Sequence, residues 1–435
     1  MPNLPNDPPI APPSFVTSSL NLLDPRQGAK VIFSTDEWFA TADNLLSTHE
    51  PEFDPLAFVS EGKLMDGWES RRRRGGGHDW CVMKLGFPGK VLGLEVDTAW
   101  FTGNYAPRVS IQAADLSKDK CDSDEWIYGG AERNANNGGV RGTCVSPEGM
   151  KKAEHDVATA GVWRDLLPMT KMVTGAQDGS GKSRQYFEVK RGGSMKRCTH
   201  IRFNYFPDGG VARLKVWGHV VKDFKADLFC AAGGSAGVLE LSSQNNGGLG
   251  LACSNQHFGV PSNLLREETG KDMGDGWETA RHLSRPPLMV TNEETGLADT
   301  DLKDWAVLRM GCVVGDVERL VLDTKFFKGN YPESVTVEYC NQPDMDPKRV
   351  CKAPGDDDET GWKPLLKRTR MGPDQVHEFT NKDLGSGNSG VIGNITHLRL
   401  SIFPDGGVSR VRLYGKAVAP IEDAGNEDGV TKSKY

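Results

Sequence analysis

The chain has 435 residues, a length that suits about two domains. Hydrophobic residues make up 37% and charged residues 26%, a composition typical of globular proteins and not of disordered or fibrous ones. Its net charge of −7 argues against a nucleic-acid partner, because binding a phosphate backbone normally needs a basic surface. The sequence has no run of about 18 apolar residues and does not begin with a basic and then apolar leader, so we expect neither membrane insertion nor secretion.

The N-terminal stretch is rich in proline, and six short blocks after it recur later in the same order. Such a repeat indicates two copies of one structural unit. We therefore predict a tail at 1–27, a first unit at 28–222, a linker at 223–247, a second unit at 248–419 and a tail at 420–435. The blocks of the first copy are DGWES at 66–70, DW at 79–80, DT at 97–98, GNY at 103–105, WRDLL at 163–167 and FPDGGVAR at 206–213, and those of the second copy begin at 275, 304, 323, 329, 362 and 403.

Apolar and polar residues alternate within each copy, which is the period of a β-strand. Asp-Gly-Gly separates two alternating segments near the end of each copy and predicts a hairpin there, since glycine tolerates positive φ. The patterns predict an all-β protein of two tandem antiparallel jelly-roll β-sandwich domains. In the first copy the expected strands are 31–34, 81–85, 92–97, 108–113, 200–205 and 212–217.

A long insertion separates the GNY and WRDLL blocks of the first copy. It runs from 121 to 152 and is polar and rich in glycine and asparagine. This composition predicts a surface loop.

The ordered blocks resemble those of the allantoicase family, and they cover nearly the whole chain in two copies. The resemblance implies tandem jelly rolls similar to galactose-binding-like domains. It also implies hydrolysis of allantoate to ureidoglycolate and urea, in the breakdown of purines and allantoin. The residues alone leave two alternatives open, a non-catalytic jelly-roll module that binds a small polar ligand or carbohydrate, and a structural scaffold.

Allantoate carries one carboxylate and two ureido groups, and arginine pairs with carboxylates through two parallel hydrogen bonds. A run of four arginines follows the first DGWES block. Its alternative role is a solvated basic loop of which only some members point inward, and the tryptophans could be core residues. The candidate substrate-binding residues are Asp36, Trp68, Arg71, Arg72, Asn104, Asp275, Glu278 and Arg281.

Departure of urea calls for a base that activates water and an acid that protonates the leaving nitrogen. Carboxylates and histidines of the first copy supply the candidates. Several have structural alternatives: His200 precedes a core strand, and aspartates in turns can bind backbone N–H groups. The candidate catalytic residues are Glu37, Asp66, Glu69, His78, Asp79, Glu95 and His200.

The two copies differ at several of these positions. Asp36 and Glu37 face Asn255 and Gln256 in the pairing of the copies, Glu95 faces Val321, and His78 faces Lys303. We therefore expect the first copy to hold the more complete acid and base set.

Metal, assembly and location are less constrained by the sequence. A divalent ion, Mn²⁺ or Zn²⁺, is left undecided because no ligand spacing is diagnostic, and we favour a reaction without metal.

Nine scattered cysteines without a CxxC pair favour a location in the cytoplasm, where thiols stay reduced. The last residues, Ser-Lys-Tyr, begin like a peroxisomal signal but lack its leucine, so peroxisomal import is less favoured. A homo-oligomer is compatible with exposed sheet edges, but the sequence does not choose a symmetry.

Overall fold

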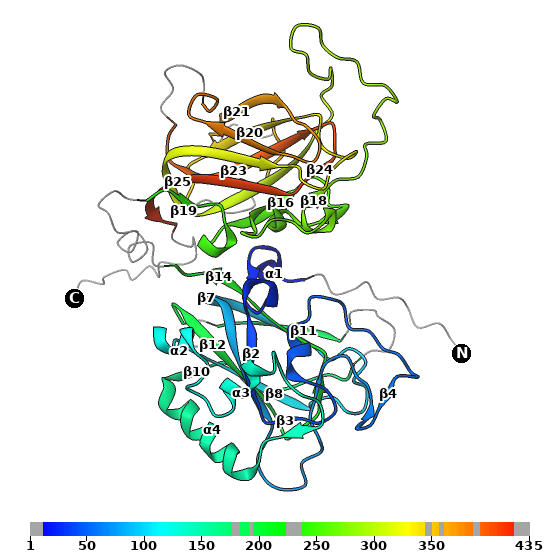
Figure 1. Cartoon of the computed structure of the whole chain (residues 1–435), viewed down its shortest axis with the longest axis vertical. Helices are drawn as coiled ribbons and strands as arrows, with labels where there is room; N and C mark the ends of the chain where they lie inside the picture. Colours follow the sequence, from blue (N-terminus) through cyan, green and yellow to red (C-terminus); the bar gives the residue numbers. More distant parts are fainter. Residues whose placement is uncertain are drawn as a thin grey trace, which may run out of the picture. The chain divides into compact units, whose positions relative to one another are not determined.

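The computed structural model describes residues 12–175, 183–190, 195–222, 237–343, 350–355, 361–385 and 392–421. It divides the chain into two compact units, 1–221 and 222–435, each built around antiparallel strands (Figure 1). The all-β prediction of two tandem sandwiches is therefore confirmed. Among the described residues, no helix is long and apolar enough to cross a membrane.

One long strand organises the first unit. The first half of β7 (Trp80–Asp97) pairs with β2 (Lys30–Ser34) and β12 (Cys198–Tyr205), and its second half pairs with β11 (Arg184–Glu188) and β14 (Arg213–Val220). The strand thus passes from one layer of the sandwich to the other, and it joins the separate strands predicted at 81–85 and 92–97. The other strands of this unit are β1 (Leu20–Asn21), β3 (Asp36–Glu37), β4 (Phe58–Val59), β5 (Gly62–Lys63), β6 (Trp68–Glu69), β8 (Arg108–Ala114), β9 (Thr143–Cys144), β10 (Trp163–Lys171) and β13 (Gly210–Val211), and its helices are α1 (Ser14–Thr17), α2 (Lys118–Asp122), α3 (Gly130–Ala135), α4 (Pro147–Ala160) and the 3₁₀ turns η1 (Pro25–Gln27) and η2 (Ala42–Leu46).

Alternation along β7 separates two packing faces. Cys81, Met83 and Leu85 belong to the main core, whereas Trp80 and Val82 belong to a second cluster on the outer face of the same layer. This is the two-residue period of a strand with both faces covered. A sheet that buries both faces needs a covering element on its outer side.

The insertion supplies that cover, and the prediction of a surface loop at 121–152 is wrong. The folded insertion extends beyond the predicted bounds, from 118 to 160, and contains α2, α3, β9 and α4. Ile127, Ala153 and Val157 pack against Trp80 and Val82. The composition misled because only one face of each short helix is apolar, so the segment is polar on average.

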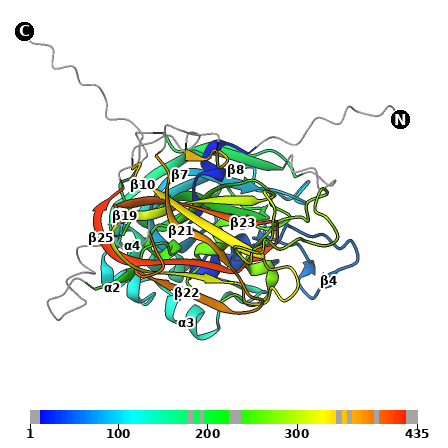
Figure 2. The same ribbon diagram turned by 90° about the horizontal axis from the view of Figure 1, so that it is seen from above.

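The second unit repeats the first around β19 (Asp304–Asp323), which pairs with β16 (Leu249–Cys253) and β23 (Ile395–Phe403) in its first half and with β22 (Val376–Thr380) and β25 (Arg410–Pro420) in its second half. Figure 2 shows β19, β23 and β25 in this unit from a second direction. Its remaining elements are β15 (Leu239–Glu240), η3 (Gln244–Asn246), β17 (Phe258–Gly259), η4 (Pro261–Leu265), η5 (Met273–Asp275), β18 (Trp277–Glu278), β20 (Ser334–Cys340), β21 (Lys363–Arg370) and β24 (Gly407–Val408).

The Asp-Gly-Gly segments form corners and not the predicted hairpins. β12 pairs with β7 and β8, whereas β14 pairs with β7 and β1, so the two strands flanking the turn are not partners. Between them β13 pairs with β6. Gly209 has a φ of +129°, and a Cβ there would lie 2.7 Å from the backbone nitrogen of Ala106, so the corner requires glycine.

Both units begin earlier than predicted. β1 pairs with β14 and Leu22 is in the main core, so the first unit includes residues assigned to the tail at 1–27. β15 pairs with β25 and Leu241 is in the second core, so the predicted linker at 223–247 is too long. The physical reason is that two-residue strands carry too little alternation to be recognised. Residues 1–11, 223–236 and 422–435 of the predicted tails and linker lie outside the described residues.

Candidate active site

A hollow of about 590 Å³ lies in the first unit, and we call it the arginine pocket. It is formed by Thr35 just after β2, by β3, by the loop that precedes β7, and by β9 and α4 of the insertion. Five of its lining side chains are cationic and three are acidic, so the pocket carries a positive balance. The lining residues are Thr35, Asp36, Arg71, Arg72, Arg73, Arg74, Gly75, Gly76, Gly77, His78, Asp79, Cys144, Val145, Pro147, Met150, Lys151 and Glu154.

The arginine run alternates in exposure. Arg71 Nε lies 2.8 Å from Asp36 Oδ2, and its guanidinium lies 4.6 Å from the centre of the Trp38 ring. Arg73 Nε lies 3.0 Å from Asp79 Oδ1. Arg72 is exposed and has no ion-pair partner among the described residues, and the same holds for Arg74. Two members of the run are thus held in place, and the other two are available to an anion.

Asp79 is the most buried ionisable group of the pocket, with 1% of its surface exposed. The Thr35 hydroxyl donates to its Oδ1 at 2.9 Å. Its Oδ2 has no hydrogen-bond partner within the part of the chain that the structure describes. Burial raises the pKa of Asp79 above its ordinary value, although the Arg73 guanidinium and the Thr35 and Ser70 hydroxyls oppose this shift. A buried oxygen without a partner is expected to bind a ligand, water or a proton.

His78 is half-buried beside Asp79 and stacks on Phe206, with ring centres 4.6 Å apart. Its Nε2 lies 3.2 Å from Asn204 Oδ1, and Asn204 Nδ2 donates to Ser110 Oγ at 3.1 Å. Because the Asn204 amide oxygen only accepts, this series of hydrogen bonds assigns the proton of the neutral His78 ring to Nε2 and leaves Nδ1 as an acceptor. Burial lowers the pKa of His78, which favours the neutral ring that a general base requires.

Two other predicted residues lie at or next to the pocket through different contacts. Asp36 lines it and pairs with Arg71, while Trp68 is fully buried and donates from Nε1 to the backbone oxygen of Asp36 at 2.8 Å. Trp68 therefore supports β3 from the core side.

Glu37 points into a neighbouring hollow of about 440 Å³, where its Oε2 lies 2.6 Å from Arg133 Nη1. Its Oε1 accepts from the Ala42 amide at 2.8 Å. Arg133 belongs to α3, so this buried pair ties the insertion to β3.

Glu69 and Asn104 are paired elsewhere in the first unit. Asn104 Nδ2 donates to Glu69 Oε1 at 2.6 Å, and burial raises the pKa of Glu69 to about 7. Neither residue lines the arginine pocket. Asn330 and Glu278 repeat this pair in the second unit at 2.5 Å, which supports a role in the fold. The assignment of Glu69 to catalysis and of Asn104 to substrate binding stays a prediction.

The remaining catalytic candidates are bound in separate clusters. Asp66 pairs with Arg213 at 2.7 Å, and Glu95 accepts from Lys215 and Trp217, each at 3.0 Å. His200 is fully buried, and burial lowers its pKa to about 3. The structure does not bring any of these three to the arginine pocket, and their assignment as catalytic residues stays a prediction.

The second unit keeps the frame of the pocket but changes its chemistry. Asn255 takes the place of Asp36, since its backbone oxygen accepts from Trp277 at 3.0 Å and its Oδ1 accepts from the Ala280 amide at 2.9 Å. Ala280 therefore stands where Arg71 stands. His282 lies 3.3 Å from Asp304, in the place of the Arg73–Asp79 pair. These differences support the predicted asymmetry between the copies.

The predicted residues of the second unit are distributed in the same way. Asp275 pairs with Arg266 at 2.9 Å, Glu278 pairs with Asn330, and Arg281 is exposed. Their role in substrate binding stays a prediction.

Sequence reasoning missed the contribution of the insertion. Cys144, Met150, Lys151 and Glu154 all line the pocket. The available signal was the spacing of 147, 150, 151 and 154, which places four residues on one helix face.

A metal site is not evident among the described residues, since no group of three His, Cys, Asp or Glu side chains suitable as ligands occurs in those ranges. The preference for a reaction without metal stays a prediction.

Two antiparallel β-sandwich units, one of them with a cationic pocket around a buried carboxylate, define a jelly-roll repeat protein. The family model for the Allantoicase repeat matches residues 20–221 and 239–418. The chain belongs to the allantoicase family, which confirms the resemblance drawn from the repeated blocks.

Relatives and solved structures agree with this membership. The chain is 35% identical over 399 residues to a probable allantoicase of Stutzerimonas stutzeri (strain A1501), covering 92% of this chain and 96% of the relative. It is 32% identical over 397 residues to a probable allantoicase of Pseudomonas fluorescens (strain Pf0-1), covering 91% and 96%. A solved allantoicase structure matches with a TM-score of 0.62 and 28% identity over 92% of this chain and 93% of that one, and the Saccharomyces cerevisiae allantoicase matches with 0.61 and 29% over 91% and 93%.

Proposed function

We propose that the chain hydrolyses allantoate to ureidoglycolate and urea, and that the reaction takes place in the arginine pocket of the first unit. The observation that carries the location is Asp79, a buried carboxylate with one unpartnered oxygen beside His78 in a cationic hollow. Perturbed titratable groups that converge in a pocket are typical of active sites.

The substrate carboxylate is bound by the exposed arginines of the run. Arg72 and Arg74 carry the charge that no described acidic side chain neutralises. A guanidinium offers a planar pair of donors that matches a carboxylate. Arg71 and Arg73 are already paired with Asp36 and Asp79, so their role is to hold those two carboxylates in place.

The chemistry replaces one ureido group on the central carbon by a hydroxyl group. His78 Nδ1 accepts a proton from water, whose oxygen forms the new bond to carbon. The bond from carbon to the ureido nitrogen breaks, and Asp79 Oδ2 delivers a proton to that nitrogen, so that urea leaves. Burial lowers the pKa of His78 and raises that of Asp79, which are the directions that a neutral base and a protonated acid require.

Urea release by the purified chain tests the function, with allantoin as the control substrate and with and without prior chelation. His78→Asn and Asp79→Asn should each lower kcat by about a hundredfold or more. His155→Asn is a matched control, because His155 is exposed on α4 and does not line the pocket. Equal losses in all three variants would contradict the location, and a chain that binds allantoate without releasing urea would favour the binding module.

We also propose a cytoplasmic location and a small-molecule substrate as the sole ligand class, with a homo-oligomer as the assembly to test by light scattering.

A further inference from the structure

We propose that Lys151 and Glu154, on helix α4 of the insertion, bind one ureido group of the substrate. The proposal rests on the function above. It assigns recognition of a ureido group, as distinct from the substrate carboxylate, to the wall of the pocket that α4 forms. Neither residue has a counterpart among the repeated blocks, because the insertion occurs in the first copy alone.

The two residues share the helix face that lines the pocket. Pro147, Met150, Lys151 and Glu154 all contribute to the lining, and residues separated by three, four and seven positions lie on one face of an α-helix. The neighbouring Lys152 does not line the pocket, and its Nζ lies 5.4 Å from the centre of the Tyr128 ring. The helix thus presents one lysine to the pocket and the next one elsewhere.

Helix α4 is held in place by contacts on its other side. Ala153 and Val157 are fully or almost fully buried and pack against the outer face of β7. Asp156 accepts from the Tyr128 amide at 2.9 Å. Ser146 caps the N-terminus of α4 by accepting from the Gly149 amide. A site whose supporting elements are fixed loses little entropy when it binds a ligand.

The pocket needs a hydrogen-bond acceptor that its other carboxylates do not supply. A ureido group has N–H donors and a C=O acceptor, whereas arginines only donate. Asp36 is engaged by Arg71, and Oδ1 of Asp79 is engaged by Arg73 and Thr35. The unpartnered Oδ2 of Asp79 carries the proton for the leaving nitrogen in the proposed reaction, so it does not serve as an acceptor. Glu154 is the lining carboxylate without a direct hydrogen bond or ion pair to any described residue, although its negative charge also acts on the Arg202 guanidinium and opposes the lowering of the Arg202 pKa by burial.

Lys151 complements Glu154 one helical turn away. Its ammonium has three donors and no acceptor, and within the described ranges it has no ion-pair partner. Glu154 therefore accepts from the ureido N–H groups, and Lys151 donates to the ureido oxygen. A pair of this kind distinguishes a ureido group from a second carboxylate, because Glu154 repels an anion.

Steady-state kinetics of allantoate hydrolysis test the assignment. Lys151→Ala and Glu154→Gln should each raise KM by about tenfold or more, as expected for a lost hydrogen bond to a charged group, with kcat within about threefold of the unsubstituted chain. Lys151→Arg should keep most of the affinity, since it preserves the positive donor. Thermal unfolding should not change in the two Lys151 variants, because Lys151 is exposed. In Glu154→Gln it measures the effect of removing the charge that acts on Arg202, separately from the change in KM.

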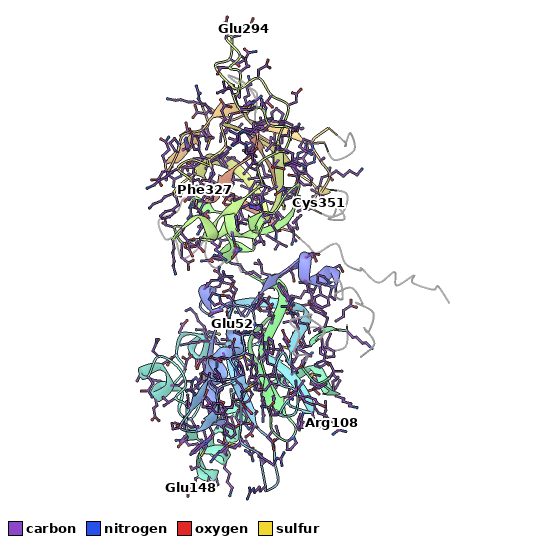
Figure 3. All side chains as sticks on the ribbon, turned by 90° about the vertical axis from the view of Figure 1, so that its right-hand side faces the viewer. Glu52, Arg108, Glu148, Glu294, Phe327 and Cys351 are labelled. Carbon is purple, nitrogen blue, oxygen red and sulfur yellow. The ribbon has the colours of Figure 1, made fainter. Side chains whose placement is uncertain are left out.

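Lys152→Ala and Glu148→Gln are the matched controls on the same helix. Glu148 is exposed, does not line the pocket, and lies at the periphery of the first unit in Figure 3. Equal KM values in the pocket-facing and control variants would overturn the proposal while leaving the proposed function intact. An unsubstituted chain that releases no urea would overturn both, and the outcomes are therefore distinguishable.

Discussion

Arg133→Leu should destabilise the first unit strongly, because it removes the partner of a buried carboxylate. Arg133 is 9% exposed, and its Nη1 lies 2.6 Å from Glu37 Oε2, whose side chain is 6% exposed. Its Nη2 also contacts Asp43, which is 36% exposed, at 2.5 Å, so that contact is more screened and contributes less. Removing one partner of a buried pair leaves an uncompensated charge and costs about 3–5 kcal/mol.

Urea-induced unfolding followed by circular dichroism measures this loss as a change in midpoint at constant slope. The double variant Arg133→Leu/Glu37→Gln should recover at least half of the loss, since no charge remains buried. The second unit has Gln256 at the position that the sequence pairs with Glu37. As a control, Arg72→Leu removes an exposed arginine and should change the free energy of unfolding by about 0.5 kcal/mol or less. A loss below about 1 kcal/mol for Arg133→Leu, or no recovery in the double variant, would refute the reasoning.

Three further predictions concern pH, the pocket and the asymmetry of the copies. Burial raises the pKa of Glu69 from its ordinary 4.5 to about 7, so the folded state binds this proton more tightly than the unfolded state. The resulting stability is present in full below pH 4.5 and is lost as the pH rises through 7, by about 3 kcal/mol in total; Glu69→Gln should remove this loss in unfolding curves compared at pH 5 and pH 8. Cys144 is exposed and lines the arginine pocket, so its alkylation should abolish urea release and allantoate should slow the labelling; a chain that stays active after complete labelling of Cys144 argues against the pocket. Glu37→Gln weakens the Arg133 pair that ties the insertion to β3 and should therefore lower turnover far more than Gln256→Ala, whereas equal losses would rule out the asymmetry.

Local pattern was sufficient for the class of fold and for the repeat. The two-residue alternation around Ile201 and Leu214 predicted strands that the structure contains as β12 and β14. The repeated blocks predicted two similar units. The pairing of Asp36 with Asn255 also holds in the structure, because each accepts a hydrogen bond from the tryptophan and from the backbone amide at the equivalent position of its own unit. These features depend on neighbours in the chain or on matched positions in the copies.

The candidate site was predicted only in part. The arginine run, His78 and Asp79 follow one another closely in sequence and meet in one pocket. Glu95 and His200 are a carboxylate and a histidine, as Asp79 and His78 are, but they lie in other clusters. They are on strands, and alternation of apolar and polar residues does not show which strands pair. Residue type indicates what a side chain can do, but not which other side chains it meets.

By itself the sequence determined the all-β class, the duplication, and the cluster of arginines, His78 and Asp79 that follows the DGWES block. Strand period and turn residues act over a few neighbouring positions, so these features can be found locally. Only the tertiary structure decided that β7 crosses between layers, that the Asp-Gly-Gly segments are corners, and that α4 forms a wall of the pocket. These depend on contacts between distant residues, such as Glu37 and Arg133, which lie 96 positions apart. Such contacts form when strands and helices pack against one another over their apolar faces, and a local sequence pattern does not show which elements pack together.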